Sequence, residues 1–170
     1  AHGANRTGRV FTGDRSGDFL FASLYRTGFA NQAQSQHRDD GLWLNGAYVT
    51  AIVRCAPPEN KPTSLERSAC RSWLEAELRL LFEVRVLIAL GGEAWRHLFR
   101  LYRDHGEAVP RPVVPFGHGT EVKIGRHTMI GSYHPSQQNT FTGRLTPSML
   151  DEVMFRGRKI AGEPTDGLES

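Results

Sequence analysis

Short apolar segments, separated by polar stretches rich in glycine and proline, set the organisation of this chain. Apolar residues recur at helical spacing over 18–25, whereas continuous runs with many β-branched residues occupy 46–53 and 84–90. The pattern predicts helices and strands in alternation, with helices over 18–25, 63–82, 92–105 and 147–160, and strands over 46–53, 84–90, 121–124 and 127–131. This alternation is typical of α/β domains, so we expect a three-layer α/β/α sandwich with a mostly parallel central sheet.

Two of the predicted helices have clear start signals. Thr63 and Glu66 have the spacing of a capping box, in which each side chain satisfies a backbone N–H at the start of a helix. Thr146 followed by Pro147 is a capping residue with proline at the first helical position. We expect one domain over residues 1–161, followed by a frayed polar tail over 162–170.

The composition argues against a membrane-spanning protein and against a small disulfide-rich secreted protein. The chain has 170 residues, 39% of them hydrophobic, and no stretch of eighteen consecutive apolar residues that could cross a membrane. Its net charge is +3 and arginine greatly outnumbers lysine, which suits contact with phosphate groups. Two cysteines are too few for the disulfide framework of a small secreted protein.

The first residues, Ala1 to Asn5, have the composition of a loop and include no methionine. A self-contained α/β domain more often begins with a strand. We therefore expect a further segment to precede Ala1, and residues 1–17 to form a loop.

Residues 6–17 (RTGRVFTGDRSG) form a basic, glycine-rich stretch that leads into the first predicted helix. Backbone N–H groups at such a helix start can bind phosphate. The stretch lacks the lysine–hydroxyl ending of a P-loop and the dinucleotide-binding fingerprint. The Asp14 carboxylate could orient water or stabilise a cation here, or it could cap the helix together with Ser16. Phe11 offers a flat face for stacking a base, and its alternative is an ordinary core phenylalanine.

Residues 131–146 (GSYHPSQQNTFTGRLT) connect a predicted strand to the last predicted helix. In an α/β sheet, ligands bind outside the carboxyl ends of the strands, where this loop would lie. His134 can stabilise a developing anion there. Further donors suited to phosphate oxygens or base edges follow at Ser136, Gln137, Gln138, Asn139 and Thr140. The alternative is an ordinary polar loop between a strand and a helix.

A third loop, the proline-rich stretch 54–62, carries Asn60 at the end of a predicted strand. We expect Asp14, Asn60 and His134 to meet at one edge of the sheet. An amide matches the polar edge of a nucleobase, a histidine stabilises a leaving anion, and a carboxylate orients water or stabilises a cation.

Cys55 and Cys70 are separated by fourteen residues, which is not the spacing of a zinc CxxC pair. Two buried free cysteines are one interpretation. A hydrolase with Cys55 as nucleophile and His134 as base is another, but two prolines follow soon after Cys55 in place of a glycine-rich oxyanion turn.

Three stretches together are similar to the family 5 uracil-DNA glycosylases, the iron–sulfur members of the uracil-DNA glycosylase superfamily. They are HGANRTGRVFTGDRSG, VRCAPPENKPT with the later Cys70, and SYHPSQQNTFTGRLT. The resemblance runs from residue 1 to about 161. It implies excision of uracil, hypoxanthine and xanthine from double-stranded DNA, by a monomer in the bacterial cytoplasm, associated with the nucleoid.

The resemblance also implies roles for individual residues. Asp14 and His134 match catalytic residues, Asn60 and His134 contact the flipped base, and Phe11 stacks on it. Cys55 and Cys70 match two of the four cysteines that hold a [4Fe-4S] cluster. Contacts to DNA are expected from the basic and amide side chains of the two loops, namely Arg6, Arg9, Arg15, Ser136, Gln137, Gln138, Asn139 and Arg144. A DNA-damage binding fragment without catalysis is the alternative.

Overall fold

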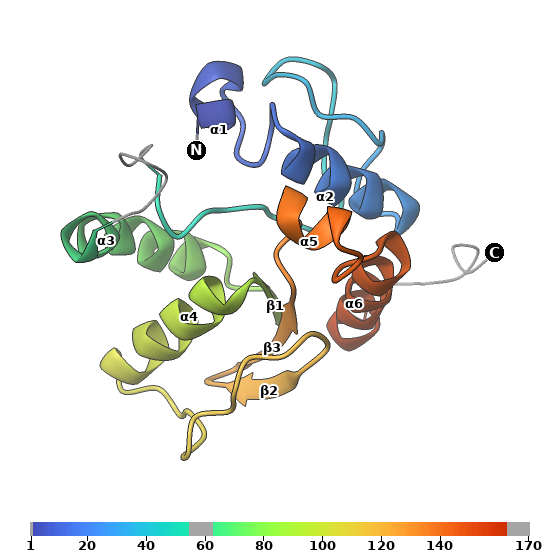
Figure 1. Cartoon of the computed structure of the whole chain (residues 1–170). Coiled ribbons are helices and arrows are strands. Elements are labelled where there is room, and N and C mark those ends of the chain that lie inside the picture. The colour runs from blue at the N-terminus through green and yellow to red at the C-terminus, as the bar shows by residue number, and fades with distance from the viewer. Residues whose placement is uncertain (1, 55–62, 163–170) are drawn as a thin grey trace. The chain divides into compact units, whose positions relative to one another are not determined.

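The computed structural model describes residues 2–54 and 63–162. The chain divides into two compact units, Ala1–Glu83 and Val84–Ser170 (Figure 1). The first unit contains three helices among its described residues, α1 (His2–Thr7), α2 (Arg15–Arg26) and α3 (Ser64–Leu80). Leu20, Phe21 and Leu24 line the buried face of α2, as their helical spacing predicts.

The second unit is built on a three-stranded sheet in the order β1-β3-β2, with helices between and after the strands. β1 and β3 are parallel, with Val86 opposite Thr128. β2 and β3 form an antiparallel hairpin, with Ile124 opposite His127. The unit's elements, in chain order, are β1 (Val86–Leu90), α4 (Gly92–Asp104), β2 (Glu121–Ile124), β3 (His127–Ser132), α5 (Gln137–Phe141) and α6 (Pro147–Ala161).

Helices α4 and α6 cover opposite faces of this sheet, so the unit has three layers (Figure 1). On one face, Tyr102 of α4 contacts His127, the first residue of β3. On the other face, Gly157 of α6 lies against Ile88 of β1, close enough that an added Cβ would come within 3.2 Å of the isoleucine Cδ1. The predicted α/β class is confirmed, with one parallel and one antiparallel strand pair in the described sheet.

Two local predictions are wrong. Residues 46–53 form no strand, although their β-branched and aromatic side chains favour one. Tyr48 and Thr50 instead donate side-chain hydrogen bonds to Glu77 of α3, which replaces a strand partner. The first residues form helix α1 in place of the expected loop. Within this short helix Thr7 Oγ1 donates to the Gly3 carbonyl at 2.8 Å. A tertiary contact also holds it, since the Arg38 N–H donates to the Thr7 carbonyl at 2.9 Å.

The predicted helix starts are confirmed. Thr63 caps α3 in a complete capping box with Glu66, and Thr146 caps α6 with Pro147 in its first turn. The short helix α5 was not predicted, because five polar and aromatic residues carry no helical periodicity. Over the described ranges, no helix is both long enough and apolar enough to span a membrane.

A buried tyrosine–histidine pair links α4 to β3. The Tyr102 hydroxyl lies 2.6 Å from His127 Nδ1, and Arg126 Nε donates to His127 Nε2 at 3.3 Å. Because Nε2 accepts, Nδ1 carries the proton of the neutral imidazole. Burial raises the pKa of Tyr102 to about 12, and burial together with Arg126 lowers the pKa of His127.

We expect the free energy of unfolding to fall as the pH drops below about 6.5, the ordinary value for histidine, because unfolded His127 binds a proton that the folded state disfavours. The slope is at most about 1.4 kcal/mol per pH unit. Denaturant unfolding of the wild type and of His127→Gln between pH 7.5 and 5 measures it. In His127→Gln the free energy of unfolding should depend less steeply on pH. Equal slopes in the two proteins would contradict the role of His127 in this pH dependence.

Candidate functional site

The loop between α1 and α2 is held from several sides within the first unit. Arg6 Nη2 donates to the Gly13 carbonyl at 2.7 Å, and the Arg6 side chain is exposed to solvent. Thr12 is buried, and its hydroxyl lies 2.5 Å from the hydroxyl of Ser35. Residues 8–14 therefore have a defined backbone path before the helix begins.

Asp14 is the N-cap of α2, as one of the two interpretations of the sequence predicted. Its Oδ1 accepts a hydrogen bond from the Gly17 N–H at 2.9 Å, and the residue is exposed. Gly17 has to be glycine, because an added Cβ would lie 1.9 Å from the Phe11 carbonyl oxygen. The cap thus fixes the orientation of the Asp14 carboxylate while leaving it accessible to a ligand from solvent.

Phe11 has a left-handed backbone conformation, with φ of 57°. For a bulky residue this conformation is rare and costs roughly 1–3 kcal/mol, and such outliers gather at functional sites. Its backbone carbonyl packs against Gly17, so the first turn of α2 holds the strained residue in place. The stacking role of Phe11 stays a prediction.

Arg9 forms a two-point ion pair with Asp40, a residue that sequence analysis did not single out. Arg9 Nη2 lies 2.8 Å from Asp40 Oδ1, and Nη1 lies 3.0 Å from Oδ2. Arg9 also donates to Ser35 Oγ and to the Arg38 carbonyl, each at 2.9 Å. Hydrogen bonding from Arg9 holds the pKa of Asp40 well below its usual range. The pairing was not predicted because the two residues are 31 positions apart in the sequence.

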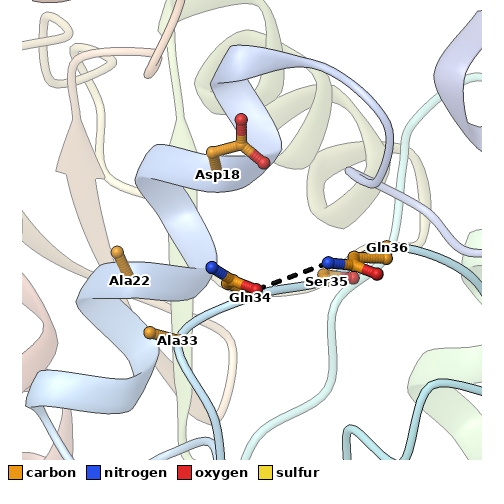
Figure 2. Close-up of a pocket in the computed structure, with 6 residues that line it drawn as sticks. All are labelled: Asp18, Ala22, Ala33, Gln34, Ser35 and Gln36. Carbon is orange, nitrogen blue, oxygen red and sulfur yellow. Dashed lines mark hydrogen bonds between the residues drawn. The ribbon is translucent and has the colours of Figure 1, made fainter.

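Beside these contacts lies an open hollow of the first unit, shown in Figure 2. Asp18 and Ala22 of α2 form one side, and a segment of the loop after α2 forms the other. Gln36 Nε2 donates to Gln34 Oε1 at 3.4 Å across the rim (Figure 2). The hollow holds no cluster of catalytic side chains, and Asp14 is not among its lining residues.

In the second unit, His134 follows β3 and is half-buried. The Asn139 side-chain amide donates to the His134 carbonyl at 2.9 Å, and Pro135 between them is buried. Gly91, at the end of β1, has φ of 95°, and an added Cβ would lie 3.2 Å from the His134 Cβ. The histidine is therefore held against the end of the parallel strand pair, where the sequence predicted it.

The rest of this loop presents an exposed face. Ser136 caps α5 by accepting from the Asn139 N–H, while Gln137 and Gln138 are exposed. Phe141 is 67% exposed, which is unusual for so large an apolar side chain. The Arg144 guanidinium lies 4.6 Å above the Tyr133 ring, which keeps an exposed cation on the same loop. Phe141 was not singled out from the sequence, although it is the aromatic residue of an otherwise polar stretch over 136–142.

Of the two predicted metal ligands, Cys70 lies within the described residues and Cys55 lies outside them. Asn60, predicted to contact the base, also lies outside them. Cys70 is partly exposed on α3, and its Sγ accepts from the Arg54 N–H at 3.4 Å. An N–H group directed at a cysteine sulfur is a contact that tunes iron–sulfur clusters, so this position fits a ligand thiolate. Within residues 2–54 and 63–162, no group of three or more His, Cys, Asp or Glu side chains could hold a metal ion.

Asp14 and Phe11 belong to the first unit and His134 to the second. Each is fixed within its own unit, and the meeting of Asp14, Asn60 and His134 in one site stays a prediction. Arg15, in the first turn of α2 next to Asp14, is exposed.

Comparison with known proteins identifies the class. The model of the uracil DNA glycosylase superfamily matches residues 1–155. The chain therefore belongs to this superfamily, in agreement with its α/β fold and with the loops that carry Asp14 and His134.

Its relatives place it more narrowly, in the type-5 family. It is 52% identical over 164 residues to a type-5 uracil-DNA glycosylase of Mycobacterium bovis, covering 95% of this chain and 60% of the relative. A type-5 enzyme of Thermus thermophilus is 48% identical, with 95% of this chain and 72% of the relative covered. A type-5 enzyme of Pyrobaculum aerophilum is 42% identical, with 95% of this chain and 68% of the relative covered. The chain spans about three fifths of the length of the mycobacterial relative.

Proposed function

We propose that this protein is a DNA glycosylase that excises uracil from double-stranded DNA by hydrolysing the N-glycosidic bond, the first step of base-excision repair. The observation that carries the proposal is Asp14, an exposed carboxylate oriented by the first turn of α2, within a chain whose type-5 relatives are named uracil-DNA glycosylases. Internal hydrogen bonds from Arg6 to the Gly13 carbonyl and between Thr12 and Ser35 hold the loop before Asp14, which is in keeping with this proposal.

The chemistry requires the nucleotide to leave the base stack, which costs roughly a few kcal/mol. Phe141 and the exposed amides of α5 form a face that could fill the space vacated by the base. The bond between C1′ and N1 then breaks, giving a cationic sugar and an anionic uracil. Water adds to C1′, and its proton is finally taken up by the departing base.

Four residues divide this work in the proposal. Asp14 stabilises the cationic sugar or orients the attacking water, and His134 stabilises the negative charge that develops on the base. Such an electrostatic donor is typically worth about 3–4 kcal/mol. Asn60 reads the polar edge of the base, and Phe11 stacks on its face. The same pocket is proposed to accept hypoxanthine and xanthine.

A [4Fe-4S] cluster belongs to the proposal as well. Cys55 and Cys70 would provide two of its thiolates, and the N–H of Arg54 at the Cys70 sulfur is in keeping with that role. When bound, the cluster would cross-link the chain and stabilise the fold. Iron analysis of protein purified without oxygen tests this part, and an active protein free of iron would contradict it.

Contacts to the DNA backbone are proposed for the basic and polar side chains of the two loops, with a monomer covering the lesion. The proposed set comprises Arg6, Arg9, Arg15, Ser136, Gln137, Gln138, Asn139 and Arg144. Within it, Arg9 and Asn139 also make the internal hydrogen bonds described above, so their loss would disturb the loops as well as the contacts.

A substrate panel tests the proposed function. Duplexes that carry one uracil, hypoxanthine or xanthine, with an undamaged duplex and a single strand as controls, are incubated with the protein and assayed for alkali-labile sites. We expect cleavage at uracil and none in the undamaged duplex. Tight binding to the uracil duplex without any cleavage would instead identify a DNA-damage binding module.

Arg144→Ala should weaken binding to all duplex sequences alike and flatten the slope of log affinity against log salt by roughly 0.9, the value for one lost phosphate contact. The matched control is Arg100→Ala, which removes an exposed arginine from α4 of the same unit. Titrations at several salt concentrations measure both. An unchanged slope in Arg144→Ala would remove this residue from the interface.

A further inference from the structure

Glu77 of α3 binds three side chains from one segment of the first unit. The Tyr48 hydroxyl donates to Oε1 at 2.6 Å, and the Thr50 hydroxyl donates to Oε2 at 2.7 Å. Arg54 forms an ion pair with Oε1. The Glu77 side chain is only 14% exposed, so these charge-assisted contacts are strong ones.

The same segment also reaches α3 at two other points. The Arg54 guanidinium lies 5.5 Å from the centre of the Trp73 ring, and the Arg54 N–H donates to Cys70 Sγ at 3.4 Å. Cys70 and Glu77 are about two helical turns apart on α3. Arg54 therefore contacts the helix through both its backbone and its side chain, one residue before Cys55.

No strand ladder supports this segment, because residues 46–54 belong to no strand. Its fixed position depends on side-chain contacts, and Glu77 makes three of them. A segment held in this way can open locally without global unfolding when its anchor is removed. Opening would withdraw the Arg54 N–H from the Cys70 sulfur.

We propose that Glu77 is a positioning residue that fixes residues 48–54 against the helix that carries Cys70, so that the Arg54 N–H is held at the Cys70 sulfur before any metal binds. This inference rests on the proposed function, because it assigns the Cys70 thiol to the cluster. It assigns Glu77 a role that neither the motifs nor the spacing of the cysteines predicted.

The test compares two variants of the metal-free full chain that carry the same chemical change on the same helix. Glu77→Gln removes the charge that binds Arg54, and Glu75→Gln removes the charge of an ordinary i,i+4 pair with Arg71. The rate of iodoacetamide alkylation at Cys70 is followed by peptide mass spectrometry, and iron per chain is measured after anaerobic reconstitution. Tyr48→Phe removes one donor only and serves as a milder variant.

We expect Glu77→Gln to raise the Cys70 alkylation rate about tenfold, the factor that corresponds to 1.4 kcal/mol, and to lower the iron content. Tyr48→Phe should show a smaller increase, and Glu75→Gln none. Equal alkylation rates in the wild type, Glu77→Gln and Tyr48→Phe would overturn the proposal. Because alkylation needs neither metal nor DNA, a wild-type chain that excises no uracil would overturn the proposed function while faster alkylation still supported the role of Glu77.

Discussion

His134→Ala is expected to lower the single-turnover rate of uracil excision by about 10²–10³-fold, the usual loss when one preorganised donor to a developing anion is removed. The loss should appear in the rate of bond cleavage and much less in DNA affinity, because the negative charge on the base develops only in the transition state. Rapid-quench measurements with enzyme in excess over a uracil duplex give this rate directly.

The matched control is His105→Ala, the same change at an exposed position at the end of α4 in the same unit. It should leave the cleavage rate unaltered. The melting temperature of both variants should stay near that of the wild type. A folded His134→Ala protein with the wild-type rate would remove this histidine from the chemistry.

Asp14 can be tested more sharply, because its two roles respond differently to two substitutions. Asparagine caps a helix about as well as aspartate, whereas alanine does not. Asp14→Asn should therefore keep the melting temperature but slow cleavage about 10²–10³-fold. Asp14→Ala should slow cleavage equally and also lose about 1 kcal/mol of stability.

Single-turnover rates and thermal melts of the two Asp14 variants separate the roles. If Asp14→Asn cleaved uracil DNA at the wild-type rate, Asp14 would be a helix cap alone. The observed hydrogen bond from Gly17 uses one carboxylate oxygen, so capping and catalysis are compatible in this geometry.

Local signals in the sequence predicted the local structure well. Thr63 with Glu66, and Thr146 with Pro147, mark their helix starts, because capping depends on residues within one turn. The strand pair around Gly125 was predicted for the same reason, since a tight turn joins adjacent segments. Asp14 was likewise predicted as a possible cap.

Contacts between distant residues were not predictable in this way. The apolar run 46–53 has strand propensity, but Glu77, nearly thirty residues later, binds its side chains. Arg9 was assigned to phosphate contact from its loop, and its pairing with Asp40 could be seen only in the fold. Phe11 was a candidate from its position, while its left-handed backbone is a property of the structure alone.

Direct identification of products tests the central claim, that this chain hydrolyses the N-glycosidic bond of uracil in DNA. A duplex with one deoxyuridine is incubated with the wild-type chain, and both the released base and the remaining strand are quantified by mass spectrometry. We predict one free uracil for each abasic site, with the sugar–phosphate backbone intact. A duplex that is bound and recovered with its uracil still attached, from folded and iron-loaded protein, would contradict the account.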